Sequence, residues 1–187
     1  MKVLKTSLPG VLIIEPRVFE DKRGFFMETY HQNRYGQIGL DCPFVQDNLS
    51  HSLCGILRGL HYQLKHPQAK LVQVIKGTVF DVTVDIRHGS PSFGQGTGVY
   101  ISDENRHQIF IPEGFAHGFC VLSETADVVY KCTDFYAPDD EEGILWSDPG
   151  LRIDWPVNDP LLSDKDSQYP CLSDVPPERL PMYKDRR

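Results

Sequence analysis

A chain of 187 residues with 40% hydrophobic and 24% charged residues is long enough for one globular domain with a substantial buried core. Its formal net charge of -7 argues against a binder of nucleic acid polymers, whose surfaces are basic, although a nucleotide ligand needs only a few local cations. No segment approaches the ~18 apolar residues of a membrane span, and Pro9-Gly10 interrupt the apolar run near the start, so we expect neither a membrane protein nor a signal peptide.

Ten short segments rich in β-branched and aromatic residues are predicted as strands, separated by turn residues at intervals of roughly ten positions. In chain order they span residues 11–19, 24–30, 44–50, 55–64, 70–77, 78–87, 98–102, 107–114, 118–124 and 126–137. Helical periodicity is scarce, and one short helix is expected within 32–40. This spacing predicts an all-β fold, a jelly-roll (cupin-like) sandwich or barrel with a few short helices near the termini.

The tail from Pro138 onward differs in character, with turn-rich segments such as "DPGLRIDWP" and "DVPPERLP". We predict a single domain over residues 1–187, in which 1–50 contribute N-terminal strands and 138–187 form a capping tail. The five cysteines are scattered and form no CxxC pair, so we predict neither a disulfide framework nor a zinc site and expect a cytoplasmic protein.

Two short motifs place polar groups in strand-like sequence. "RGLHYQ" carries His61, with Lys70 nine residues later, and "IPEGFAHGF" has Pro, Gly and His117 at the spacing of the second cupin motif. A metal-binding cupin would also need His-x-His, but the chain reads His61-Tyr62-Gln63, and a lysine ammonium would oppose a bound cation. We therefore expect no metal, while both histidines could equally be satisfied core residues.

Several blocks of the sequence together resemble one family, the dTDP-4-dehydrorhamnose 3,5-epimerases. The similarity runs from about Lys5 to Pro170, and its blocks are "FVQDNLSHS", "GILRGLHYQ", "QAKLVQV", "VFDVTVDIRHGSPSFG", "IPEGFAHGFCVLSE", "VVYKCTDFYAP" and "LSDKD". One departure is Gly96 in "FGQGTG", where many members of the family carry tryptophan; we expect it to affect packing or pocket shape more than chemistry. The resemblance implies conversion of dTDP-4-dehydro-6-deoxy-D-glucose to dTDP-4-dehydro-L-rhamnose.

Such a reaction requires no cofactor, which agrees with the absence of any GxGxxG or P-loop sequence. The hydrogens on C3 and C5 flank the C4 ketone, so each can leave as a proton if the enolate is stabilised, and inversion needs a base on one face and an acid on the other. By resemblance, His61 is the base, Asp166 orients its ring, Lys70 stabilises the enolate and Tyr130 is the acid. From the residues alone, Lys70 could be a solvated strand-start lysine and Asp166 a helix cap.

Strand alternation adds an independent expectation at the end of the 126–137 segment. Tyr130, Cys132, Asp134 and Tyr136 fall on one face, so if Tyr130 points into the barrel, Tyr136 should too. Tyr136, ahead of Phe135, would then be the aromatic that stacks on the thymine implied by the resemblance. The resemblance adds further substrate-binding residues: Arg23, Glu28, Gln46, Asp47, Asn48, Arg58, His117, Glu141 and Lys165. Phe19 and Phe26 are candidates to wall the base pocket, and Asp81 to pair with Lys70 or fix the pocket.

Strict alternation places Arg58 and His61 on opposite faces of their strand, although both are expected to reach the ligand. We therefore predict a bulge or twist at Gly59 that shifts the register.

Three alternative functions stay open at this point: a mono-epimerase of a related dTDP-keto-sugar, a metal-dependent cupin isomerase or dioxygenase, and a non-catalytic sugar-nucleotide binding module. The resemblance implies a homodimer, and the long apolar N-terminal strands are expected to pack against the partner and bring Arg23 or Glu28 near the neighbouring site.

Overall fold

A computed structural model of the chain describes residues 1–184. Its strands are β1 (Lys2–Lys5), β2 (Leu12–Glu15), β3 (Val18–Asp21), β4 (Gly24–Met27), β5 (Gln46–Leu53), β6 (Leu57–Gln63), β7 (Lys70–Lys76), β8 (Thr78–Asp85), β9 (Gly96–Ser102), β10 (Gln108–Ile111), β11 (Phe115–Val121), β12 (Thr125–Cys132) and β13 (Glu141–Gly143). The helical segments are α1 (Gln32–Gly36) and short 3₁₀ turns at Pro138–Asp140, Asp166–Gln168, Leu172–Asp174 and Pro177–Arg179. Within 1–184, no helix is long and apolar enough to cross a membrane.

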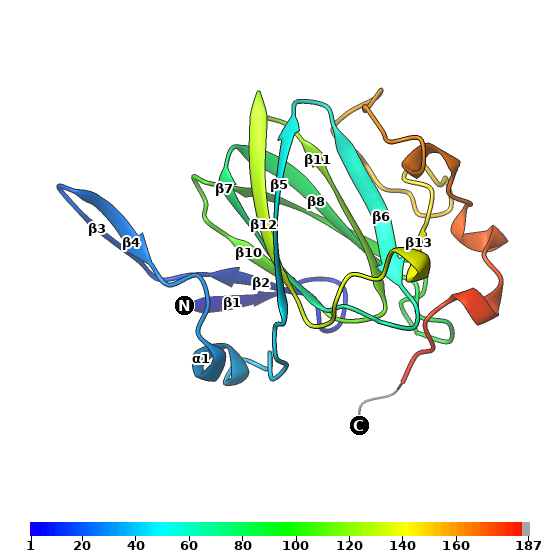
Figure 1. Cartoon of the computed structure of the whole chain (residues 1–187), viewed down its shortest axis with the longest axis horizontal. Helices are drawn as coiled ribbons and strands as arrows, with labels where there is room; N and C mark the ends of the chain where they lie inside the picture. Colours follow the sequence, from blue (N-terminus) through cyan, green and yellow to red (C-terminus); the bar gives the residue numbers. More distant parts are fainter. Residues whose placement is uncertain (185–187) are drawn as a thin grey trace.

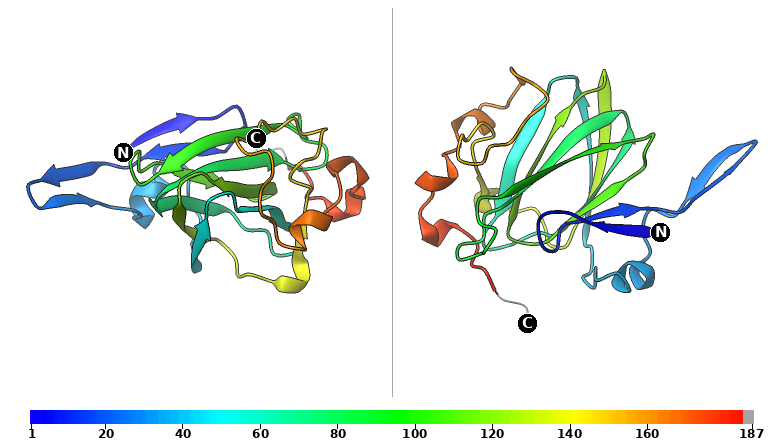
Figure 2. Two further views of the ribbon diagram at one scale, coloured as in Figure 1. Left: turned by 90° about the horizontal axis from the view of Figure 1, so that it is seen from above. Right: turned by 180° about the vertical axis from the view of Figure 1, so that it is seen from behind.

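The strands form two main antiparallel sheets that face each other. One has the order β1-β2-β10-β7-β12-β5 and the other β13-β6-β11-β8-β9. From β5 onward consecutive strands alternate between the two sheets, except that β8 and β9 pair within the same sheet. This arrangement confirms the predicted all-β, cupin-like jelly roll. A separate two-stranded hairpin, β3 with β4, projects away from the body of the molecule (Figure 1), as it also does in the view from behind (Figure 2).

Three buried clusters hold these layers together. The first occupies part of the space between the two sheets, with Val72, Ile109 and Phe119 among its members. The second covers the outer face of the five-stranded sheet with side chains of the C-terminal tail, including Leu172 and Leu180, each of which stabilises the fold by ~1.5–3 kcal/mol when buried. The third packs α1 and the following turn onto the outer face of the other sheet. The tail is thus anchored beside β6 and β13.

The strand boundaries depart from the predicted ones in physically explicable places. The single strand predicted over 11–19 is two strands, β2 and β3, because Pro16 lies between them and has no amide hydrogen to donate to a ladder. The strand predicted over 126–137 ends at Cys132, since the Asp134 carboxylate then accepts a hydrogen bond from the amide of Phe135. β1 and β13 were not predicted; both are short and are defined by their pairing partners.

Candidate active site

A cavity of about 690 Å³ lies between the two sheets and is lined from β5, β6, β7, β11, β12 and β13 together with residues 161–166. It collects most of the residues that the sequence predicted for the site. Eleven of them line it: Gln46, Asn48, Arg58, His61, Lys70, His117, Tyr130, Tyr136, Glu141, Lys165 and Asp166. The fold therefore brings together residues that are up to 120 positions apart in the chain (166 minus 46).

His61 and Asp166 form a hydrogen-bonded pair at this cavity. The imidazole Nε2 lies 2.6 Å from Asp166 Oδ1, while Nδ1 lies 3.6 Å from Glu141 Oε1. Burial acts to raise the pKa of Asp166, but the interactions with His61, Ser163 and the Gly59 backbone together outweigh burial, and the pKa lies below its ordinary value. An ionised carboxylate only accepts, so Nε2 must donate, which leaves the lone pair of neutral His61 on Nδ1. The pair thus presents a base to the cavity.

The predicted irregularity in β6 is present and brings two cavity residues to the same side. His61 pairs with His117 of β11 and Arg58 pairs with Phe119, so three steps along β6 match only two along β11. Gly59 lies at this register shift with φ +115°, and a Cβ there would be 2.6 Å from the Cα of Gly118. Arg58 and His61 consequently both line the cavity. The prediction of a bulge at Gly59 is confirmed.

Lys70 enters the cavity from the opposite sheet. It opens β7, opposite Cys132 of β12, and its side chain is half-buried rather than solvated. Desolvation lowers the pKa of Lys70, opposed in part by the nearby Cys132, Glu141 and Asp81. An ammonium in such a low-dielectric position interacts strongly with any oxyanion placed beside it.

Tyr130 also comes from the opposite sheet, facing β6 across the cavity. It lies on β12 between Asn48 of β5 and Val72 of β7, and it lines the cavity. Burial, the largest effect, raises the pKa of Tyr130 above its ordinary value of 10.0. The phenol is therefore protonated at neutral pH and can donate a proton.

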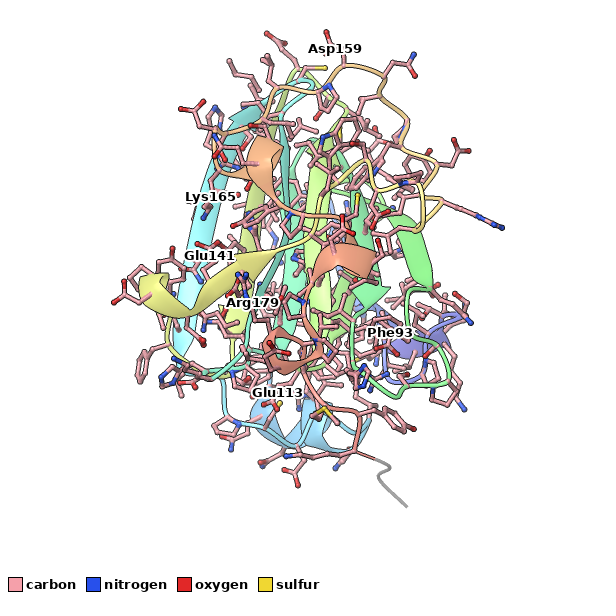
Figure 3. All side chains as sticks on the ribbon, turned by 90° about the vertical axis from the view of Figure 1, so that its right-hand side faces the viewer. Phe93, Glu113, Glu141, Asp159, Lys165 and Arg179 are labelled. Atoms are coloured by element: carbon pink, nitrogen blue, oxygen red, sulfur yellow. The ribbon has the colours of Figure 1, made fainter. Side chains whose placement is uncertain are left out.

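Tyr136, Glu141 and Lys165 are joined by hydrogen bonds at the cavity rim. The Tyr136 hydroxyl donates to Glu141 Oε2 at 2.7 Å, and Lys165 Nζ donates to the same oxygen at 2.6 Å. Figure 3 shows Lys165 and Glu141 close together on one side of the molecule. The bond to Glu141 raises the pKa of Tyr136 to about 12. Tyr136 lies beyond the end of β12, but its backbone amide donates a hydrogen bond to Gln46 Oε1 at 2.9 Å, and Tyr136 still lines the cavity.

His117 is paired with a buried carboxylate. Its Nε2 lies 2.8 Å from Asp81 Oδ2, and Asp81 is fully buried on β8. Of the two roles considered for Asp81, the structure therefore favours fixing a cavity side chain, His117, over an ion pair with Lys70. On the neighbouring strand, Arg58 Nε donates to Ser52 Oγ at 3.1 Å, which leaves the rest of the guanidinium for other partners.

Three predicted substrate-binding residues do not reach this cavity. Asp47 is absent from the cavity lining, and its carboxylate accepts a bond from Lys131 Nζ at 2.9 Å on the face of β5 opposite that of Gln46 and Asn48; its role in substrate binding stays a prediction. Arg23 donates to Asp21 at the tip of the β3–β4 hairpin, and Glu28 pairs with Arg34. Phe19 and Phe26, the two candidates for the wall of the base pocket, are exposed on the hairpin that carries Arg23.

Gly96 lies away from the cavity. It belongs to β9 and lines a smaller hollow of about 180 Å³ between β8, β9 and residues 151–154, which shares no residue with the candidate site. A Cβ at position 96 would meet Val84 and Ile153 at ordinary distances of 3.6 and 3.7 Å. The departure at this position thus concerns packing on the outer face of the sheet.

The cavity also contains residues that were not proposed for it. Cys132 lies beside Lys70 and accepts a weak bond from Asn48 Nδ2 at 3.6 Å; its alternation with Tyr130 already indicated this orientation. Ser163 Oγ accepts a hydrogen bond from the Asp166 amide at 3.1 Å, a contact that the Ser-x-x-Asp spacing of a capping box could have indicated. Among residues 1–184, no group of three or more His, Cys, Asp or Glu side chains is arranged to hold a metal ion.

Comparison with known proteins gives a consistent result. The family model for dTDP-4-dehydrorhamnose 3,5-epimerase matches residues 5–174. The dTDP-4-dehydrorhamnose 3,5-epimerase of Shigella flexneri is 58% identical over 168 residues, 89% of this chain and 93% of that protein. Its counterpart in Methanothermobacter thermautotrophicus is 52% identical over 178 residues, 94% of this chain and 96% of that protein.

Solved structures are similar over nearly the whole chain. The dTDP-6-deoxy-D-glucose-3,5-epimerase of Legionella pneumophila, in complex with dTDP-4-keto-L-rhamnose, has a TM-score of 0.96 at 50% identity and covers 98% of both chains. A 3'-monoepimerase of Streptomyces bikiniensis, in complex with dTDP-quinovose, has a TM-score of 0.89 at 36% identity, covering 95% of this chain and 92% of that one. On the family match and these identities, the chain belongs to the dTDP-4-dehydrorhamnose 3,5-epimerase family.

Proposed function

We propose that this cavity converts dTDP-4-dehydro-6-deoxy-D-glucose to dTDP-4-dehydro-L-rhamnose by inverting C3 and C5. One observation carries the proposal: an imidazole base and a protonated phenol, His61 and Tyr130, extend from the two opposing sheets into one cavity. A sugar ring held between the sheets would meet the base on one face and the acid on the other, which is the arrangement that inversion requires.

In the proposed reaction His61 Nδ1 removes the proton on C3 or C5, and the electron pair of that C–H bond moves toward the C4 oxygen. The Lys70 ammonium stabilises the resulting enolate, and Asp166 stabilises the imidazolium. Tyr130 then gives its proton to the same carbon from the opposite face. One proton is taken and one is given, so the sugar is an isomer, and proton exchange with solvent restores His61 and Tyr130 before the second centre reacts.

The nucleotide is held in this proposal by the remaining cavity residues. The ring of Tyr136 stacks on thymine, while the cations Arg58 and Lys165, with His117, face the diphosphate. Planar guanidinium groups suit phosphate oxygens, and Arg58 has donors left for them beyond its bond to Ser52.

The test is NMR of the product formed in D₂O from dTDP-4-dehydro-6-deoxy-D-glucose, with enzyme dialysed against a chelator. We expect the rhamno-configured ketosugar with solvent deuterium at both C3 and C5. The His61→Asn variant should lose ~10²–10⁴-fold in rate, as is typical for loss of a general base, while it still binds dTDP. Deuterium and inversion at one centre only would establish a mono-epimerase, and activity that returns only on adding a divalent metal would establish a metal-dependent reaction.

The proposal includes a homodimer in the cytoplasm. The projecting β3–β4 hairpin exposes Phe25 and Phe26, the latter with 70% of its surface accessible, and two-stranded hairpins are marginal in water. β5 is an edge strand of its sheet and exposes Leu49 and Leu53. A second copy could cover these apolar surfaces, and its hairpin would supply Arg23 to the neighbouring cavity.

A further inference from the structure

One short segment of the tail contacts the His61 ring twice. Asp166 begins the 3₁₀ turn Asp166–Gln168 and binds Nε2, while Tyr169 follows the turn directly. The ring centroids of Tyr169 and His61 are 5.8 Å apart with the planes at 70°, an edge-to-face arrangement that aromatic pairs favour. The imidazole is thus held at one atom by a carboxylate and against one side by an aromatic ring.

The chain makes specific room for the Tyr169 ring. Gly143 of β13 pairs with His61 of β6, and a Cβ at position 143 would lie 2.3 Å from Tyr169 Cε2. The segment is tied down just beyond the ring, because the amide of Leu145 donates to the carbonyl of Pro170 at 2.8 Å. Glycine at 143 is therefore the only residue that leaves the ring of Tyr169 in its place beside His61.

The hydroxyl of Tyr169, unlike its ring, makes no specific contact in the described part of the chain. Its oxygen is buried and makes no hydrogen bond within the described part of the chain. Burial, and then the carboxylates of Glu141 and Asp166, raise the pKa of Tyr169, so the phenol is neutral. What Tyr169 contributes at this position is the packing of its ring.

We infer that Tyr169 is a positioning residue for His61: its ring fixes the plane of the imidazole so that Nε2–H stays on Asp166 and the Nδ1 lone pair faces the cavity. A single hydrogen bond through Nε2 leaves the imidazole free to tilt about that contact, and the Tyr169 ring and the Gly143 backbone remove this freedom. The inference rests on the proposed role of His61 as the base. Tyr169 would be the group that fixes the orientation of that base.

The first experiment compares Tyr169→Phe with Tyr169→Ala. Phenylalanine keeps the ring and should retain wild-type kcat, KM and dTDP affinity. Alanine should lower kcat on the order of tenfold with KM little changed, because a tilted base is misaligned rather than absent. Nitrogen-15 NMR of the free protein should show one His61 tautomer, with the proton on Nε2, in wild type and Tyr169→Phe, and a mixture of tautomers in Tyr169→Ala.

The second experiment reaches the same ring from the other side. Gly143→Ala should displace Tyr169 and reproduce the loss of kcat and the mixed tautomer, whereas adding Gly143→Ala to Tyr169→Ala should cause no further loss, since the clashing ring is gone. Gly96→Ala is the matched control: another strand glycine without positive φ, whose added Cβ would meet nothing closer than 3.6 Å and which lies outside the cavity. It should leave both readouts unchanged.

The results separate this inference from the proposed function. Full kcat in Tyr169→Ala, additive losses in the double variant, or loss of kcat with an unchanged His61 tautomer would each overturn the positioning role. Tyr169→Leu, which keeps apolar bulk, serves in place of alanine if that variant unfolds, with the same expected loss. If His61→Asn is fully active, the proposed base fails instead, while the tautomer spectra still report whether Tyr169 fixes the ring.

Discussion

At the scale of single residues, the proposed reaction depends on the hydrogen bonding and burial of three ionisable side chains. His61 is paired with a carboxylate on one sheet, while Lys70 and Tyr130 are desolvated on the other. The desolvation moves Lys70 toward easier deprotonation and Tyr130 toward tighter retention of its proton. Tyr130 therefore keeps the proton that it is proposed to donate, whereas the same burial works against the charge of Lys70, so Lys70 limits the pH range in which both groups are protonated.

Tyr130→Phe should separate deprotonation from inversion. Phenylalanine keeps the packing of the half-buried ring and removes only the hydroxyl, so substrate should still bind. His61 should still remove protons from C3 or C5 and return them to the same face. In D₂O the variant should therefore introduce deuterium into recovered substrate while forming little rhamno-configured product. Inversion at the wild-type rate would assign the proton to another donor, and loss of both exchange and product would place Tyr130 in enolate formation.

The pH dependence of kcat should report Lys70. Because burial disfavours the ammonium, its pKa in the folded protein lies below the ordinary 10.5, so activity is complete below that lowered pKa and is lost as pH rises through it. Tyr130 titrates above 10.0 and should not limit activity first. Lys70→Arg, which keeps its charge to higher pH, should move the alkaline limb upward in whatever activity it retains, and Lys70→Met should lose ~10²–10³-fold. An alkaline limb that is unchanged in Lys70→Arg would assign it to another group.

At the scale of elements, the irregular strand β6 positions two of the proposed site residues, Arg58 and His61. Its register shift at Gly59 turns Arg58 and His61 to the same cavity, and the Gly59 amide also bonds Asp166. The short strand β13 pairs with the other edge of β6 and places Glu141 at the rim. The carboxylates around His61 thus come from elements that follow β6 by at least 78 positions (141 minus 63).

Gly59→Ala should therefore destabilise the protein and impair the site together. The added Cβ would lie 2.6 Å from both Gly118 Cα and the His117 carbonyl oxygen, in backbone with φ +115°. We expect a loss of about 1–3 kcal/mol or more in the free energy of unfolding, measured by urea denaturation. Gly55→Ala is the control, since Gly55 also has positive φ (+78°) but nothing within 4 Å of its Cβ. Equal stability of the two variants would show that close approach at Gly59 is unimportant.

At the scale of the whole molecule, the β3–β4 hairpin is the part that the single chain leaves unexplained. It extends away from both sheets (Figures 1 and 2) and carries Arg23 at its tip, far from the cavity lining. An exposed hairpin with aromatic side chains is what a protein would present to a second copy of itself. The position of Arg23 makes sense if that copy contains the cavity it serves.

Subunit complementation tests this arrangement. Arg23→Ala and His61→Asn should each be weakly active alone, and both should be dimers by light scattering. A mixed dimer contains one site with His61 from one chain and Arg23 from the other, so random mixing after unfolding and refolding should restore about a quarter of wild-type activity. If Arg23 acts within its own chain, or not at all, the mixture will be no more active than the average of the two variants.

Much of this architecture follows from the sequence alone. Alternating β-branched segments bounded by Gly, Pro and Asp predicted the jelly roll, since a strand with one apolar face must bury it against another sheet. The face of Tyr130 and Cys132 followed from a period of two, and the need for both Arg58 and His61 at one ligand located the register shift at Gly59. These are local properties, set by residues a few positions apart.

The tertiary structure decided what depends on distant pairs. Alternation by itself puts Asp47 and Asn48 on opposite faces of β5, but which of these faces meets the cavity depends on pairing with β12. Three further features depend on contacts between residues 26 or more positions apart (169 minus 143). They are the burial of Lys70, the pairing of Asp81 with His117, and the packing of Tyr169 on His61 over Gly143. No local pattern encodes such contacts, because they arise only when two sheets and a tail close over the same space.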